Sequence, residues 1–155
     1  MARSRPSGEV SSFTFDFSPL YRLAAAPFGI TPSSTRVELC GDALDVRFGP
    51  WAVLTPLANV TDAEVSGPFS VVKTIGPARL SVADRGLTFA TNAARGVCIR
   101  FADPVAGLEP LGVLRHPGLT VTVEDVHGLV AALRHEQRTP SVVDVESELL
   151  TAPRR

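Results

Sequence analysis

Apolar and polar positions alternate over many short segments of this chain and take up a helical spacing near its C-terminus. Leu119–Val123 alternates apolar residues with threonine, a period of two that is typical of a half-buried strand. Directly after it, four apolar residues follow the i, i+3, i+4, i+7 spacing of one helix face: Val126, Leu129, Val130 and Leu133. The pattern predicts a β-rich body that ends in an amphipathic helix.

The junction between these two segments has features of a helix start. Thr122 and Asp125 have the spacing of a capping box, in which side chains bond the open backbone N–H groups of the first turn. Glu124 and Asp125 add negative charge there, which the helix dipole favours. Gly128 weakens the helix by about 1 kcal/mol relative to alanine, so packing against the sheet must stabilise it.

Upstream of this helix, short strands are separated by glycine and proline turns. The strands that we predict are Phe13–Phe17, Val37–Cys40, Leu44–Phe48, Trp51–Leu54, Val60–Val65, Arg79–Val82, Leu87–Thr91, Val97–Phe101 and Leu119–Val123. Gly41-Asp42, Gly49-Pro50 and residues 83–86 are tight-turn sequences. Leu20–Phe28 predicts a short helix or an apolar crossing, and Ser70–Ile75 is an apolar run without alternation.

Many short strands at close spacing favour a mainly β fold, an antiparallel barrel or sandwich. The length of 155 residues predicts one domain with tails. We expect a flexible polar arm over residues 1–12, a single β-barrel-plus-helix domain over 13–135, and a tail over 136–155. Val142, Val145, Leu149 and Leu150 of the tail suit a short amphipathic helix, and a disordered tail is the alternative.

Charge and composition limit the kinds of partner that we expect for this chain. The net charge of −1 argues against a nucleic-acid partner and against attraction to an anionic membrane. The N-terminus lacks the apolar core of a signal peptide, and no apolar run is long enough for a transmembrane segment. Cys40 and Cys98 each lie in a strand-like run and are interpreted as buried thiols of a reducing compartment. We therefore expect a cytoplasmic protein.

Candidate chemistry is sparse. His127 and His135 are eight residues apart, too far for a metal pair on one helix face, and no nucleophile has a local base partner. We therefore predict no metal, no cofactor and no enzymatic activity. The candidate binding residues are Arg115 and His116, a basic pair beside a Pro-Gly turn that suits an anion, and Trp51, a core residue or a stacking platform.

The stretch Ala43–Leu133 resembles bacterial pleckstrin-homology-like (PH-like) domains. Three segments carry the likeness: Leu44–Val60, Arg85–Ile99 and the closing strand and helix Val123–Leu133. The resemblance implies two nearly orthogonal antiparallel sheets with the helix plugging one open end. It also suggests a small protein of high-GC bacteria, in keeping with 14 arginines against one lysine.

PH-like relatives in eukaryotes grip phosphoinositides with a basic loop between the first two strands. The equivalent turn, Gly41–Ala43 or Thr31–Arg36, is not rich in lysine or arginine, which argues against that ligand. The leading functional hypothesis is a non-catalytic binding or assembly module that recognises a protein partner or self-associates, because such barrels add strands at open edges. The alternatives are a small-ligand carrier with a hollow barrel and a split-barrel flavin enzyme.

Overall fold

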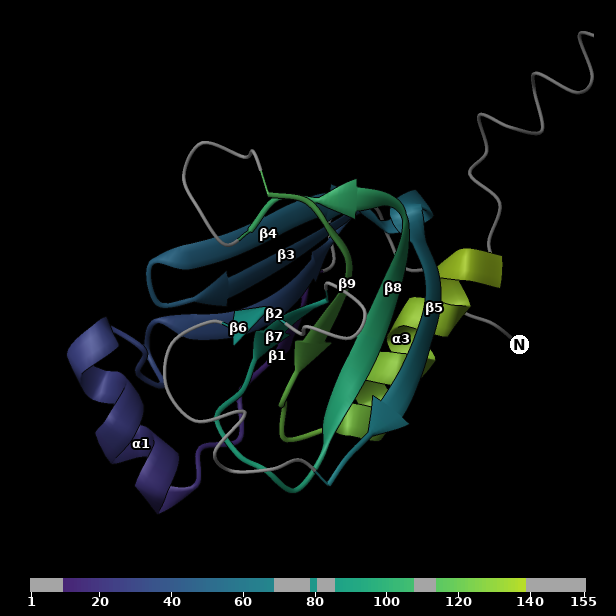
Figure 1. Cartoon of the computed structure of the whole chain (residues 1–155). Helices are drawn as coiled ribbons and strands as arrows, with labels where there is room; N and C mark the ends of the chain where they lie inside the picture. Colours follow the sequence, from purple (N-terminus) through teal and green to yellow (C-terminus); the bar gives the residue numbers. More distant parts are fainter. Residues whose placement is uncertain (1–9, 69–78, 81–85, 108–113, 139–155) are drawn as a thin grey trace, which may run out of the picture.

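The computed structural model describes residues 10–68, 79–80, 86–107 and 114–138. These residues form two β-sheets, and the C-terminal helix packs along the second sheet (Figure 1). In chain order the elements are β1 (Val10–Phe13), α1 (Pro19–Ala25), η1 (Ala26–Phe28), β2 (Thr35–Cys40), β3 (Ala43–Phe48), β4 (Trp51–Pro56), η2 (Leu57–Asn59), β5 (Val60–Ser66), β6 (Arg79–Leu80), β7 (Leu87–Phe89), β8 (Gly96–Val105), β9 (His116–Val121) and α3 (Val126–Arg138).

The first sheet has the order β1-β2-β3-β4 and is antiparallel throughout. Its two tight hairpins are those predicted at Gly41-Asp42 and Gly49-Pro50. Gly41 and Gly49 have φ of 58° and 59°, a backbone conformation that glycine adopts without the strain of a side chain. The alternating residues of β2, β3 and β4 bury their apolar side chains on one face of this sheet, which leaves the other face open.

The second sheet has the order β5-β8-β9-β7-β6, and here the expected topology is partly wrong. The predicted antiparallel pairing of Arg79–Leu80 with Leu87–Thr88 is confirmed. However, β7 and β8 are not neighbours, because β9 lies between them and pairs with β7 in parallel. The sheet is therefore mixed, whereas the sequence pattern predicted an antiparallel one.

The expectation of a closed barrel is also wrong, since the described strands form two separate sheets. The break lies between β4 and β5. Pro56, the last residue of β4, has no N–H to donate to a ladder, and η2 turns the chain before β5 begins. Leu57 N–H donates to Asp42 O at 2.7 Å, which fixes this turn to the β2–β3 hairpin. The coarser prediction of a two-sheet, mainly β fold is confirmed.

The first strand begins earlier than predicted. β1 pairs with β2 from Val10 to Phe13, so its first three residues fall inside the expected arm. Phe15 then forms an isolated bridge with Val123, and Asp16 N–H donates to Thr122 O at 2.9 Å. The N-terminal segment therefore crosses from the first sheet to the end of β9.

A single apolar core fills the space between the sheets. Its buried members come from both sheets and from α3, and include Phe48, Phe89, Leu119, Leu129 and Leu133. The rings of Phe48 and Phe89 are stacked with centroids 4.8 Å apart, and Phe15 lies 5.4 Å from Phe48. Three segments that are distant in sequence thus meet at one aromatic cluster.

The predicted apolar face of α3 is confirmed: Val126, Leu129, Val130 and Leu133 are all buried. The helix packs against β5, β8 and η2, and Gln137 Nε2 donates to Val60 O at 2.8 Å. It therefore closes the core beside an edge strand and extends three residues into the expected tail.

The predicted capping box is wrong. Thr122 is fully buried and its hydroxyl bonds Thr91, accepting from the Thr91 N–H at 2.7 Å. Asp125 caps α3 alone, and its carboxylate accepts from Gly128 N–H at 2.9 Å. A Cβ added at Gly128 would run into that carboxylate. An alanine at this position would therefore require the Asp125 side chain to move away from its capping position.

A two-substitution cycle tests this cap. We expect Gly128→Ala to change the free energy of unfolding little, because the loss of the Asp125 cap, about 1 kcal/mol, offsets the gain in helix propensity. In an Asp125→Ala background the same substitution is expected to raise the free energy of unfolding by up to about 1 kcal/mol, since only helix propensity then differs. Urea denaturation of the four proteins measures both steps. An equal gain in both backgrounds would contradict this account.

Several expectations fall partly or wholly outside the described residues, namely residues 1–9 of the arm, the run Ser70–Ile75, residues 81–82 of the predicted strand, the turn at 83–85 and most of the tail. Cys40 lies in β2 and Cys98 in β8; they form no disulfide, and both are partly buried where full burial was expected. Within the described ranges no helix is long and apolar enough to cross a membrane.

Candidate functional site: a groove on the outer face of the second sheet

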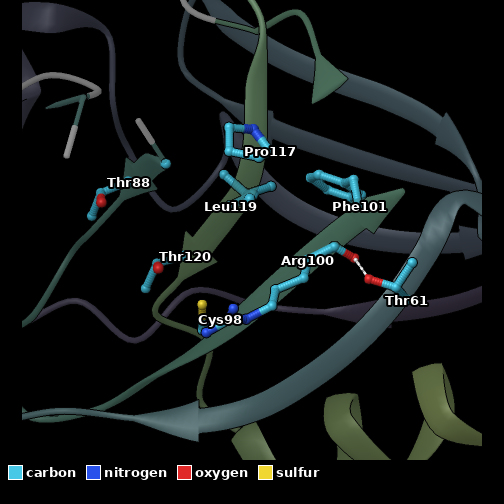
Figure 2. A pocket seen from close by; sticks show the side chains of 10 residues that line it. Thr61, Thr88, Cys98, Arg100, Phe101, Pro117, Leu119 and Thr120 are labelled. Carbon is cyan, nitrogen blue, oxygen red and sulfur yellow. Dashed lines mark hydrogen bonds between the residues drawn. The ribbon is translucent and has the colours of Figure 1, made fainter. Parts of the chain in front are cut away.

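The outward side chains of the second sheet surround a concavity of about 500 Å³ (Figure 2). Strand alternation turns Leu87, Phe89, Ile99 and Leu119 into the core and leaves their neighbours facing outward. The concavity is lined by Thr61, Thr88, Cys98, Arg100, Pro117, Gly118 and Thr120, which are at least partly exposed, and by the buried residues Gly86, Phe101 and Leu119. We call this concavity the groove.

Strand order brings these side chains together. Thr120 of β9 lies directly opposite Cys98 of β8 on one side and Thr88 of β7 on the other. This row of two hydroxyls and a thiol exists because β9 is inserted between β7 and β8. The next row places Arg100 opposite Gly118.

Gly118 forms part of the floor of the groove because it has no side chain. A Cβ at this position would sit 3.1 Å from Ile99 O, closer than nearly all real contacts of that kind. Beyond Gly118 the register of β8 and β9 shifts between Arg100 and Val105, so the ladder is irregular at this end. Such irregularities bend a sheet and change the direction of its side chains. This bend accounts for the concavity on the outer face of the second sheet.

Arg100 supplies the positive charge of the groove. Figure 2 shows its side chain lying along the sheet face toward Cys98. Its Nη2 is 3.9 Å from Glu64 Oε1, and the two side chains are 63% and 52% exposed, so the ion pair is loose. Its backbone oxygen accepts from the Thr61 hydroxyl at 3.3 Å (Figure 2). The guanidinium therefore stays accessible for a partner.

The groove is chemically suited to binding. Threonine hydroxyls donate and accept hydrogen bonds, a guanidinium donates several, and the exposed Pro117 adds apolar surface. Among the described residues, no carboxylate or histidine lines the groove; the carboxylates Asp62 and Glu64 stand beside it on β5. Over the described part of the chain there is no group of three or more His, Cys, Asp or Glu side chains that could hold a metal ion.

The three residues predicted from sequence lie elsewhere. His116 is fully buried in β9 opposite Val105, where the sequence indicated a turn. Arg115 is exposed, and its Nη1 donates to Pro104 O at 3.4 Å, across the irregular end of the β8–β9 ladder. Trp51 is partly buried and packs against the core, in line with the core alternative. None of the three lines the groove, although Pro117 and Gly118 directly follow the predicted pair.

Sequence reasoning missed Thr88, Cys98, Arg100, Gly118 and Thr120 as a group. Alternation alone places each of them outward, and that signal was available. Their proximity depends on β9 lying between β7 and β8, which no local pattern encodes.

Comparison with known proteins gives no relative from which a function can be transferred. No protein-family model, no curated protein and no solved structure matches the chain. The fold and the groove define a two-sheet, mainly β domain with a concavity on the outer face of its second sheet.

Proposed function

We propose that this protein is a non-catalytic binding module that holds an extended polypeptide segment of a partner in the groove. The observation that carries the proposal is the hollow over Gly118, bordered by hydroxyls and by the accessible guanidinium of Arg100. An extended peptide presents backbone carbonyls and N–H groups along its length. Arg100, Thr88 and Thr120 offer matching donors and acceptors, while the exposed Pro117 offers apolar contact.

The packed interior favours binding at an outer surface. It argues against the small-ligand carrier, because a carrier of that kind needs a hollow barrel. Core side chains from both sheets and α3 occupy the space between the sheets. Among the described residues that line the groove, Arg100 is the only cation, so they offer no cluster of anion-binding side chains that would hold the phosphate of a flavin.

We further propose that the fold is of the PH-like kind. The two-sheet body, the tight hairpin between β3 and β4 and the C-terminal helix with its buried face support this assignment. The parallel pairing of β7 with β9 departs from the all-antiparallel pattern of that family.

A peptide-display screen against the purified full-length chain tests the proposed function. We expect selected peptides to bind Arg100→Glu and Thr120→Arg variants at least about 10-fold more weakly than the unmodified protein, a loss of about 1.4 kcal/mol. The first variant reverses the accessible charge and the second fills the groove. Fluorescence anisotropy with labelled peptides measures each Kd.

The matched control is Arg134→Glu, a charge reversal at an exposed position of α3, away from the groove. It is expected to leave every Kd unchanged. Peptides that bind both groove variants as tightly as the unmodified protein would overturn the proposal, as would a screen that enriches none.

A further inference from the structure

The open face of the first sheet has an unusual distribution of charge. The β2–β3 register places Arg36 directly opposite Arg47 and Glu38 directly opposite Asp45. Residues that face each other in an antiparallel pair have Cα atoms about 4.5–5.5 Å apart, and like charges in such pairs destabilise a sheet. The face therefore carries one positive row and one negative row.

Contacts along the strands compensate these rows only in part. Arg36 Nε is 3.1 Å from Glu38 Oε1, and Arg47 Nε is 3.5 Å from Asp45 Oδ1. The arginine side chains remain 43% and 52% exposed, so water screens both pairs. Residues two apart on a strand are separated by about 6.6 Å, so the two rows are distinct bands of opposite sign.

Apolar side chains flank this charged quartet on the β4 side and beyond the negative row, while Ser12 of β1 lies opposite Glu38. One row crosses all four strands through Val10, Cys40, Ala43 and Pro56. In the rows of the quartet, Ala52 stands opposite Arg47 and Leu54 opposite Asp45. Leu54 is 72% exposed and Val10 54%. Exposed apolar side chains beside ordered charges are typical of a protein–protein contact.

We infer that this face binds the same face of a second copy of the chain. The relevant two-fold axis runs across the strands, between the positive row and the negative row. Rotation about it lays Arg36 of one copy over Glu38 of the other, and Arg47 over Asp45. Each copy thus relieves the like-charge repulsion within the rows of its partner.

The same rotation also matches the apolar positions of β4, because Leu54 lies in the negative row and Ala52 in the positive row. A large exposed side chain on one copy therefore meets a small one on the other, and the reciprocal contact follows by symmetry. Two-fold contacts require a surface that is complementary to itself in this way. A face with equal and opposite rows satisfies that requirement, whereas a partner of single-sign charge would match only one row.

The size of the face sets the expected affinity. Four strands spaced by about 4.8 Å and six residues rising about 3.3 Å each give a footprint of roughly 400 Å². This lies at the low end for specific complexes, so we expect a reversible dimer whose population changes on dilution. The surface is distinct from the groove, which lies on the other sheet.

Two complementary charge reversals of the full-length chain test the inference. The acidic variant is Arg36→Glu with Arg47→Glu, and the basic variant is Glu38→Arg with Asp45→Arg. Sedimentation velocity across a dilution series is expected to give a dimer for the unmodified chain. Each variant alone is expected to have a dimer Kd at least about 10-fold higher, because rows of like charge then face each other. An equal mixture of the two variants is expected to recover a mixed dimer.

Two further variants keep the result interpretable. Leu54→Glu preserves the quartet and changes a side chain that is already mostly exposed, so it is expected to fold and to lose the dimer even if a reversed quartet does not fold. Arg134→Glu with Arg138→Glu is the matched control, a reversal of two exposed arginines on α3, and is expected to leave the dimer Kd unchanged.

A monomer at every concentration of the unmodified chain would overturn the inference. Full dimerisation of either reversed variant alone, or no recovery in the mixture, would do the same. Peptide binding in the groove is measured on other residues, so failure of one proposal is distinguishable from failure of the other.

Discussion

Replacement of Phe48 by alanine is expected to lower the free energy of unfolding by about 3–5 kcal/mol. Phe48 is fully buried in β3, stacks on Phe89 of β7 and contacts Phe15 of the N-terminal segment. Its ring thus joins the first sheet to the second and to the segment that crosses between them. The substitution removes the ring and leaves a cavity that three backbone segments cannot all move to fill.

Urea denaturation followed by tryptophan fluorescence measures this loss. Trp51 is the single tryptophan of the chain and is paired with Phe48 across the β3–β4 hairpin, so it reports on the affected region. The matched control is Phe28→Ala, the same chemical change at a side chain that is 47% exposed, for which we expect a loss below about 1 kcal/mol. Phe48→Leu keeps most of the volume and is expected to lose less than about 1.5 kcal/mol. Equal losses for Phe48→Ala and Phe28→Ala would contradict the role of the cluster.

The local sequence pattern was sufficient to predict those elements whose structure depends on residues that are neighbours in the chain. The hairpins at Gly41-Asp42 and Gly49-Pro50 are encoded by turn glycines between two alternating runs, and both were predicted correctly. The buried face of α3 was predicted for the same reason, since helical spacing identifies it without reference to any partner. Even there, the cap was misassigned, because the Thr122 hydroxyl bonds Thr91, which is distant in sequence.

Pairings between distant segments were not predictable in this way. The strand sequences of β7, β8 and β9 indicate which side chains face outward, but not that β9 lies between the other two. Without that order, Thr88, Cys98 and Thr120 are three unrelated residues. His116 illustrates the converse error, because its Pro-Gly neighbours suggested an exposed turn while the irregular β8–β9 ladder buries it.

The two open sheet faces differ in a way that neither composition nor net charge reveals. The chain has nearly equal numbers of acidic and basic residues, and its net charge of −1 does not indicate how these charges are distributed over the surface. Register separates the charges of the first sheet into rows, while on the second sheet it leaves Arg100 beside a glycine floor. The binding properties that we propose for the domain therefore depend on strand pairing rather than on overall charge.

Replacement of Leu129 by alanine is expected to lower the free energy of unfolding by about 2–5 kcal/mol and to do so in a single transition. Leu129 is fully buried on the face of α3 that packs against β5, β8 and η2. A helix of 13 residues has little stability alone, so its docking and the rest of the core must form together.

Far-ultraviolet circular dichroism reports on the helices and Trp51 fluorescence on the first sheet, so their urea transitions test whether the Leu129→Ala protein unfolds as one unit. We expect the two curves to coincide, because side chains of α3 and of both sheets belong to one core. Arg134→Ala, an exposed position of the same helix, is expected to change stability by less than about 0.5 kcal/mol. A dichroism transition that precedes the fluorescence transition would show instead that α3 undocks before the sheets unfold.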